Sequence, residues 1–247
     1  MVELVRDGGV ARIFLNRPHK VNALDSALLD ALAACLEGLA GDETLRVVVL
    51  AGRGRAFCAG ADVHELAALE PRSARDFAAR IHRACDAARR LPVPVVAQLH
   101  GAVIGAGLEL AAACDLRIAA EGTRFAMPEV RLGIPSVVEA ALLPRLVGSG
   151  RAAWLVLTGE PIDAQRAYDW GLIEVVCAPA DLDQSVAATV QRLLAGERRA
   201  LQMQKELLHA WDEQPLAQSI AESLERFAQA YAGAEPKRRL RNTIPRA

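Results

Sequence analysis

The segment VVAQLHGAVIGAGLELAAAC, residues 95–114, decides the fold. Its first five residues are mostly apolar and predict a buried strand, and residues 106–114 predict a helix. Between them, Gly105 and Gly107 permit backbone angles that other residues rarely adopt, and they allow a ligand to approach closely. The first N–H groups of a helix lack partners within the helix and lie at the positive end of its dipole. This junction is therefore suited to bind a ligand oxygen.

A second junction, RGRAFCAGAD at residues 53–62, has the same character. One such junction could bind a phosphate, whereas two that converge on one point would form an oxyanion hole. The plainer alternative is that each stretch is only a tight turn, because tight turns need small residues. A dinucleotide site is disfavoured, since Leu110 stands where the third glycine of the GxGxxG fingerprint would be.

Outward from these junctions, strand patterns alternate with helical ones. Strands are expected at residues 10–15, 46–51, 95–99, 116–119 and 172–176. Helices are expected from a cap at Asp25 or Ser26 to near Gly41, and at residues 73–90, 106–114, 137–147 and 151–157. This order predicts an α/β fold with largely parallel strands, and the apolar run at 46–51 predicts burial on both faces. From about residue 181 only helices are expected. We therefore predict a core at residues 1–190 and a helical region at 191–247.

The composition limits the class of protein. The chain of 247 residues has a formal net charge of −1, so no basic field favours nucleic acid or an anionic membrane. Its five cysteines include no CxxC pair and have no histidine at zinc-ligand spacing, which disfavours a metal site and suits free thiols. We find neither a signal-peptide pattern nor an apolar stretch long enough to span a membrane, and expect a cytoplasmic protein.

The motifs, taken in chain order, resemble those of the enoyl-CoA hydratase/isomerase (crotonase) family. The two junctions are similar to the family's FxAGAD and NGxxxGGGxEL segments, at residues 57–62 and 100–110. Its NRPxxxNAL opening is matched at residues 16–24. Its PExxLG, LTGE and AxxxGLVxxV segments are similar to residues 128–133, 157–160 and 167–176. The resemblance spans residues 10–176.

This resemblance implies a crotonase-like spiral of ββα units, followed by a C-terminal helical trimerisation region. It implies an acyl-CoA thioester substrate, no cofactor beyond the CoA of that substrate, no metal, and no nucleic-acid or membrane partner. A homotrimer or a dimer of trimers is the implied assembly. By motif position, the backbone N–H groups of Ala61 and Ala106 would bind the thioester oxygen, and Glu109 and Glu129 match the two catalytic glutamates of the hydratases.

Further positions follow from the same resemblance. CoA would lie along two loops, in contact with Lys20, Val21, Ala23, Ala59, Gly60, Asp62, Val63 and Gly105. The acyl-pocket candidates are Leu132, Pro135, Ser136 and Glu139, in a stretch that is one residue shorter than the family's glycine-rich PGxGGT turn. Glu139 is either a third carboxylate of the pocket or, as the sequence favours, an acid in the first turn of a helix. No chemical partner is expected for the histidines His19, His82, His100 and His209.

The presence of both glutamates favours a hydratase, a lyase that reversibly converts a 2-enoyl-CoA to a 3-hydroxyacyl-CoA. The first alternative is a shift of the double bond between the 3- and 2-positions, which would use Glu129 alone. Thioester hydrolysis and decarboxylation share the same oxyanion hole. The alternative from another class is a non-enzymatic CoA-binding scaffold, against which the two glutamates argue.

Overall fold

The computed structural model describes the backbone of residues 1–243 and the side chains of residues 1–241. The chain forms two compact units, Met1–Ala195 and Gly196–Ala247. The predicted boundary at residue 190 falls inside helix α8 (Leu182–Ala195), which belongs to the first unit. The assignment of catalysis to one part and oligomerisation to the other stays a prediction.

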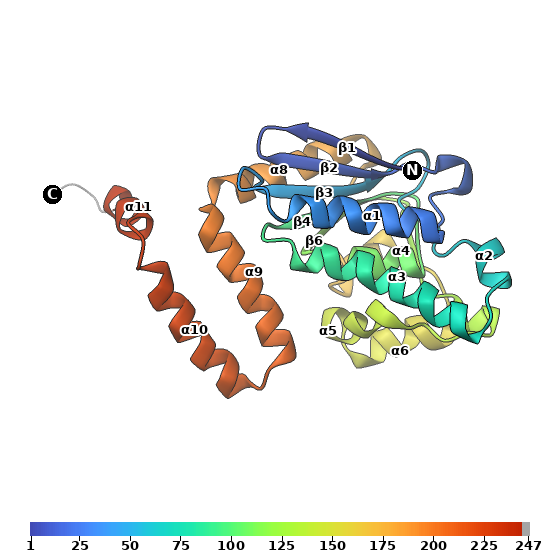
Figure 1. Cartoon of the computed structure of the whole chain (residues 1–247). Helices are drawn as coiled ribbons and strands as arrows, with labels where there is room; N and C mark the ends of the chain where they lie inside the picture. Colours follow the sequence, from blue (N-terminus) through green and yellow to red (C-terminus); the bar gives the residue numbers. More distant parts are fainter. Residues whose placement is uncertain (244–247) are drawn as a thin grey trace. The chain divides into compact units, whose positions relative to one another are not determined.

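A six-stranded sheet forms the frame of the first unit (Figure 1). Its order is β1 (Val2–Asp7), β2 (Val10–Leu15), β3 (Val47–Gly52), β4 (Val95–Leu99), β6 (Leu116–Ala120) and β9 (Val175–Cys177). The β1–β2 pair is antiparallel and the later pairs are parallel, which confirms the predicted α/β core. A second sheet, which the sequence did not predict, joins β5 (Ala102–Ile104), β7 (Arg124–Ala126) and β8 (Ile162–Asp163).

The helices of the first unit largely follow the predicted periodicity. Asp25 caps α1 (Ser26–Leu39), since its Oδ1 accepts the N–H of Leu28 at 2.8 Å. The predicted helix at 137–147 is instead a 3-10 helix, η3 (Val138–Leu142), followed by α5 (Leu143–Val147), because Pro144 cannot donate to residue 140 and starts a new helix. The remaining elements are α2 (Val63–Ala67), α3 (Pro71–Arg90), α4 (Ala106–Ala112), α5 (Leu143–Val147), α6 (Ser149–Thr158), α7 (Ala164–Asp169), η1 (Pro18–Lys20), η2 (Glu129–Leu132) and η4 (Pro179–Asp181).

The strand β3 is buried on both faces, as its continuous apolar sequence predicts. Val48 and Leu50 belong to a large core that includes the apolar faces of α1 and α3. Val47 and Val49 belong to a smaller core that also contains Leu182, Val186 and Val190 of α8. The sheet therefore has helices packed against each side, which fixes the carboxyl ends of its strands.

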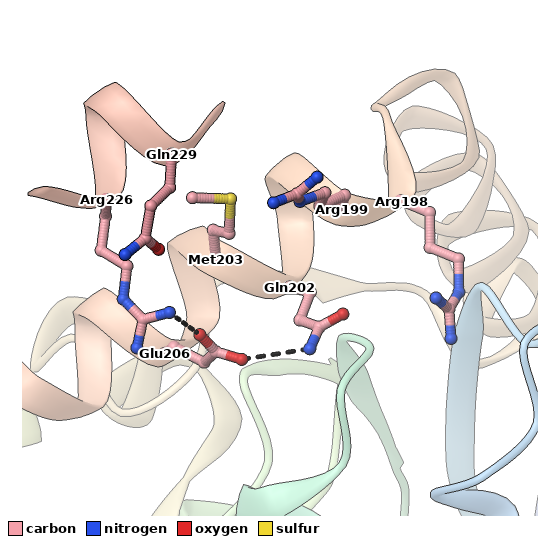
Figure 2. A pocket seen from close by; sticks show the side chains of 7 residues that line it. All are labelled: Arg198, Arg199, Gln202, Met203, Glu206, Arg226 and Gln229. Carbon is pink, nitrogen blue, oxygen red and sulfur yellow. Dashed lines mark hydrogen bonds and ion pairs between the residues drawn. The ribbon is translucent and has the colours of Figure 1, made fainter. Parts of the chain in front are cut away.

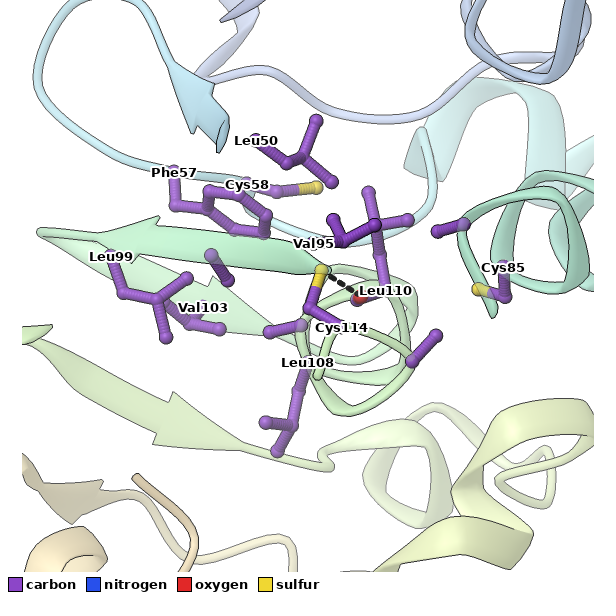
Figure 3. Packing of buried hydrophobic residues seen from close by; sticks show 14 of the residues in the cluster. Leu50, Phe57, Cys58, Cys85, Val95, Leu99, Val103, Leu108, Leu110 and Cys114 are labelled. Carbon is purple, nitrogen blue, oxygen red and sulfur yellow. Dashed lines mark hydrogen bonds between the residues drawn. The ribbon is translucent and has the colours of Figure 1, made fainter. Parts of the chain in front are cut away.

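The helix α4 is surrounded by this large core (Figure 3). All seven of its residues are buried, and its leucines Leu108 and Leu110 belong to the same cluster as Phe57, Leu99 and Val103. An isolated helix of this length would be marginal in water, so its position depends on packing. The packing therefore holds the backbone N–H groups at the N-terminus of α4 in place.

The second unit is helical through residue 243, as predicted. It consists of α9 (Arg198–Glu213), α10 (Leu216–Ala230) and α11 (Glu235–Thr243). Arg226 of α10 forms an ion pair with Glu206 of α9 at 2.9 Å. Several large apolar side chains are exposed in this unit: Leu208, Trp211, Leu216, Ile220, Leu224, Phe227, Tyr231 and Leu240. In the part of the chain described, no helix combines the length and apolar character needed to cross a membrane.

Candidate active site

The two glycine-containing junctions lie side by side. The first runs along β5, since the N–H of Cys58 donates to the carbonyl of Ala102 at 2.9 Å and the N–H of Ile104 donates to the carbonyl of Cys58 at 3.1 Å. Where this contact ends, a Cβ on Gly60 would stand 2.9 Å from the carbonyl oxygen of Ile104 and 3.9 Å from the Cα of Gly105. The structure therefore brings the two junctions together, which is the condition for an oxyanion hole.

The N–H groups of Ala61 and Ala106 have no acceptor among residues 1–243. The groups that flank Ala61 are bonded, because the N–H of Leu24 donates to the carbonyl of Gly60 and the N–H of Asp62 donates to the carbonyl of Leu24, both at 2.8 Å. Ala106 is the first residue of α4, so no earlier turn of helix offers its N–H an acceptor. Two N–H groups on adjoining segments are thus available to a ligand oxygen.

Glu129 lies against the second junction. A Cβ on Gly105 would collide with Oε1 of Glu129, so the carboxylate occupies the space that the glycine leaves open. Gly105 has a φ of +51°, and its N–H donates to the carbonyl of Ala126 at 2.8 Å. Ser136 donates its hydroxyl hydrogen to Oε2 of Glu129 at 2.8 Å. The half-buried carboxylate is therefore held close to the start of α4.

Glu109 is buried in the same region, with 3% of its surface exposed. Burial, followed by the charges of Glu129 and Glu139, raises the pKa of Glu109 to about 8, while the backbone amide of Ala140 lowers it. Glu109 therefore holds a proton at neutral pH. The charge of Glu129 is one of the causes of this shift, which links the two carboxyl groups electrostatically.

Glu139 lies in the first turn of a helix, η3, as the sequence favoured. It is also only 6% exposed, and its Oε1 bonds Nδ1 of His82 in α3 at 2.7 Å. Burial raises the pKa of Glu139, and the bond to His82 lowers it. The expectation that His82 has no chemical partner is wrong. The sequence gives no sign of this pair, because 57 positions separate the two residues.

Seven of the eight positions predicted to bind CoA lie on two loops that bond to each other, and the eighth, Gly105, precedes α4. The N–H of Ala59 donates to the carbonyl of Val21 at 3.0 Å, and Lys20 is exposed at the end of η1. Val21 and Asn22 have φ values of +54° and +56°. The buried amide of Asn22 donates to the carbonyl of Ala56 at 2.8 Å and so ties the loops together. The motif NAL contains Asn22 but does not by itself indicate this role of the side chain.

Asp62 uses its carboxylate within the protein. Its Oδ2 accepts a hydrogen bond from the guanidinium of Arg17 at 2.6 Å, and its Oδ1 accepts the N–H of His64 at the start of α2 at 2.9 Å. The same guanidinium donates to the carbonyl of Ala23 at 3.0 Å. Val63, in contrast, is exposed. These contacts give Asp62 a structural role in shaping the loop.

The four residues predicted to line the acyl pocket divide into two pairs. Leu132 and Pro135 are exposed. Ser136 bonds Glu129, and the charge of Glu139 acts on Glu109. The structure thus brings Ser136 and Glu139 to the two glutamates, and leaves Leu132 and Pro135 at the surface.

A cavity of about 330 Å³ lies in the second unit (Figure 2). Arg226 and Gln202 both bond Glu206 there, at 2.9 and 3.1 Å. No residue predicted for the site lines this cavity. Its lining consists of Arg198, Arg199, Gln202, Met203, Glu206, Arg226 and Gln229. Over the described chain, no three His, Cys, Asp or Glu side chains are grouped so as to hold a metal ion.

Comparison with known proteins identifies the family. The model of the enoyl-CoA hydratase/isomerase family matches residues 6–241. The chain is 30% identical over 238 residues to the short-chain-enoyl-CoA hydratase of Clostridium acetobutylicum, covering 96% of this chain and 91% of that protein. It is 30% identical over 236 residues to the crotonyl-CoA hydratase of Syntrophomonas wolfei, covering 95% and 91%. A crystal structure of an enoyl-CoA hydratase from Bacillus anthracis matches with a TM-score of 0.93 at 30% identity, covering 97% and 94%. The chain therefore belongs to the enoyl-CoA hydratase/isomerase family and has the crotonase fold.

Proposed function

We propose that the protein is an enoyl-CoA hydratase, which reversibly adds water to a 2-enoyl-CoA and forms a 3-hydroxyacyl-CoA. One observation carries the proposal: Glu129 lies against Gly105 and Glu109 lies in the first turn of α4, beside two N–H groups that have no acceptor in the described chain. Relatives named short-chain-enoyl-CoA hydratase and crotonyl-CoA hydratase support it. The reaction requires no cofactor, because carboxyl groups and amides can perform every proton transfer and charge stabilisation.

The N–H groups of Ala61 and Ala106 would donate to the carbonyl oxygen of the thioester. As the water oxygen bonds to C3, the π electrons of the C2–C3 bond move toward the carbonyl, and its oxygen gains negative charge. Donors fixed around that oxygen stabilise this state more than the ground state. The rigid burial of α4 supports such a role for Ala106.

Glu109 and Glu129 would divide the two proton transfers. The ionised member of the pair takes a proton from the attacking water, and the protonated member gives its proton to C2. The water O–H bond and the carboxylic O–H bond break as the new carboxylic O–H and C2–H bonds form. The raised pKa of Glu109, at about 8, supports Glu109 as the member that gives a proton at neutral pH.

We further propose that CoA lies along the paired loops and contacts mainly their backbone. The side chains of Asn22 and Asp62 are engaged within the protein, which leaves backbone groups and Lys20 as the available contacts. The exposed fractions of Leu216 (77%), Leu224 (68%) and Phe227 (66%) support subunit packing through the second unit, as a homotrimer or a dimer of trimers. The five free cysteines support a reducing, cytoplasmic setting.

Crotonyl-CoA turnover, followed as loss of the enoyl-thioester absorbance, tests the proposal. We expect hydration of crotonyl-CoA, and a panel of 2-enoyl-CoAs of increasing length would define the acyl pocket. Conversion of 3-enoyl-CoA to 2-enoyl-CoA without hydration would show that the protein is an isomerase and not a hydratase. Tight binding of acyl-CoA without any conversion would exclude both enzymatic functions and indicate a CoA-binding scaffold.

A further inference from the structure

The buried thiol of Cys58 lies between the two glycine-containing junctions and has no part in the proposed proton transfers. We propose that Cys58 is a positioning residue, which holds the N–H groups of Ala61 and Ala106 at the separation that lets both donate to one thioester oxygen. The inference rests on the proposed hydratase function, because it concerns the oxyanion hole of that reaction.

The backbone of Cys58 joins the first junction to β5. Its N–H donates to the carbonyl of Ala102 at 2.9 Å, and its carbonyl accepts the N–H of Ile104 at 3.1 Å. Cys58 is completely buried and belongs to the large apolar cluster (Figure 3). Its side chain therefore starts from a fixed position beside the segment that leads into α4.

The sulfur of Cys58 holds the backbone next to Ala61. It accepts the N–H of Gly60 at 3.4 Å, and residues 1–243 offer this N–H no other acceptor. The thiol donates to the carbonyl of Asn22 at 3.2 Å, nearer than the carbonyl of Gly60 at 4.0 Å. Hydrogen bonds of sulfur are weak, but a buried N–H that lacks any acceptor is costly. Loss of the sulfur should therefore make Gly60 move.

Gly60 is the pivot on which the direction of the Ala61 N–H depends. Its φ is +96°, and glycine has more backbone freedom than any other residue. The peptide before Gly60 is bonded to the sulfur of Cys58, and the carbonyl of the peptide after it accepts the N–H of Leu24 at 2.8 Å. The carbonyl and the N–H of a trans peptide point in opposite directions, so this second bond turns the N–H of Ala61 away from Leu24. The two bonds together hold the peptides on both sides of the pivot.

The side chain of Cys58 also lies against the first turn of α4. A Cβ on Gly107 would stand 2.7 Å from the Cβ of Cys58 and 2.8 Å from its sulfur, which is too close for any side chain. Gly107 directly follows Ala106, the second proposed donor. Cys58 thus contacts the residue before one donor and the residue after the other. A change in its hydrogen bonds should therefore alter the distance between the two N–H groups.

The test compares two variants of Cys58 that have nearly the same volume. Cys58→Ala removes both bonds of the sulfur, whereas the hydroxyl of Cys58→Ser can accept the N–H of Gly60 and donate to the carbonyl of Asn22. On crotonyl-CoA, Cys58→Ala should lower kcat about 10-fold, because a misplacement of about 1 Å can cost about 100-fold and a smaller one costs less. KM should change little, since the donors act mainly in the transition state. Cys58→Ser should restore most of the lost kcat.

Infrared spectroscopy of a bound thioester reports on the two donors directly. Butyryl-CoA labelled with ¹³C at C1 has no double bond to hydrate, and hydrogen bonds to its carbonyl oxygen lower the stretching frequency. Binding to the wild type should lower this frequency. In Cys58→Ala the band should return toward that of free butyryl-CoA, and in Cys58→Ser it should stay near the wild-type position.

Cys114→Ala is the matched control. Cys114 is another buried cysteine, and its thiol donates to the carbonyl of Leu110 at 3.4 Å, at the opposite end of α4 from Ala106. Its removal should lower the melting temperature but leave the infrared band and kcat unchanged. Gly107→Ala is the reciprocal variant, because its methyl group pushes on Cys58 from the side of α4, and it should shift the band as Cys58→Ala does.

Three results separate this inference from the proposed function. A wild-type band in folded Cys58→Ala would overturn the inference, as would an equal shift in Cys114→Ala, which would reduce the effect to general packing. If Cys58→Ala does not fold, a wild-type band in Gly107→Ala has the same meaning. A wild type that binds butyryl-CoA but hydrates no 2-enoyl-CoA would contradict the proposed function, while the infrared band would still decide the role of Cys58. A wild type that binds no acyl-CoA would contradict both.

Discussion

Gly105 leaves open the space that the carboxylate of Glu129 fills, so that a methyl group on Gly105 would collide with Oε1. The two residues come from different elements, since Gly105 precedes α4 and Glu129 begins η2. The absence of a side chain at one position therefore sets the position of a proposed catalytic group at another.

Gly105→Ala should strongly reduce activity and destabilise the protein modestly. The methyl group displaces Glu129, and a misplacement of about 1 Å can cost about 100-fold in rate. The φ of +51° adds a backbone cost of about 1–2 kcal/mol. The matched control is Gly122→Ala, with a φ of +80° and nothing within 4 Å of the new Cβ. Equal kcat values in the two variants, together with equal melting temperatures, would contradict this role for Gly105.

Ala106→Pro should remove one oxyanion donor with little damage to the fold. The first residue of a helix tolerates proline, because its N–H has no partner in the helix. We expect kcat on crotonyl-CoA to fall about 10²–10³-fold. Ser149→Pro is the matched control, since Ser149 also begins a helix after a glycine with positive φ. Circular dichroism should show both variants folded, and wild-type turnover by Ala106→Pro would exclude this N–H from the mechanism.

Glu109→Gln and Glu129→Gln should each reduce the rate of hydration by about 10²–10⁴-fold, because each removes one of the two proton-transfer groups. The volume of the side chain is nearly unchanged, so the packing should be preserved. The double variant should be little worse than the poorer single variant, since the residues act as a unit. Glu121→Gln, at an exposed position in the turn before β7, serves as the control. Retention of activity by Glu109→Gln alone, with a dead Glu129→Gln, would indicate an isomerase.

The stability of the wild type relative to Glu109→Gln should fall as the pH rises from about 5 to 8. The pKa of Glu109 is about 8 in the folded protein, so the folded state keeps a proton that the unfolded state releases from about pH 4.3. The contribution is fully present below the unfolded pKa and declines by at most about 1.4 kcal/mol per pH unit until the folded pKa is passed. Urea unfolding at three pH values measures it. A constant difference in unfolding free energy between wild type and variant would show that Glu109 is ionised throughout.

Leu224→Glu and Phe227→Glu should weaken subunit association. Both side chains are exposed in the isolated chain, and a charge in a packed interface is costly. Light scattering of each purified variant should show smaller particles than the wild type. Gln218→Glu, at an exposed polar position of the same helix, should assemble normally. An unchanged assembly in both apolar-to-charged variants would remove this surface from the interface.

The strands and helices that carry the site could be predicted because their patterns are local. The strand β3 is a continuous apolar run, and α1 has both its cap and its periodicity in the sequence. The strand β1 was missed because four of its six residues are exposed and polar and apolar residues do not alternate regularly in VELVRD. The strands β5, β7 and β8 have only two or three residues each, too few to show a period.

The residues of the candidate site likewise divide into those that a local sequence pattern predicts and those that only the folded chain brings together. Glycines at strand-to-helix junctions and the two glutamates could be predicted because each belongs to a short motif. The pairing of His82 with Glu139 could not, since it arises when α3 packs against η3. The buried position of Asn22 could not be recognised either, because its partners Arg53 and Ala56 lie in a distant segment.

Cys58, in the first junction, affects how the protein reacts with alkylating agents and oxidants. Burial raises the pKa of Cys58 to about 12, and its sulfur faces the carbonyl of Asn22 at 3.2 Å and the N–H of Gly60 at 3.4 Å. A thiol without thiolate character reacts slowly with alkylating agents and peroxides. Although it lies only three residues before Ala61, this cysteine gives oxidants no reactive nucleophile at the oxyanion loop.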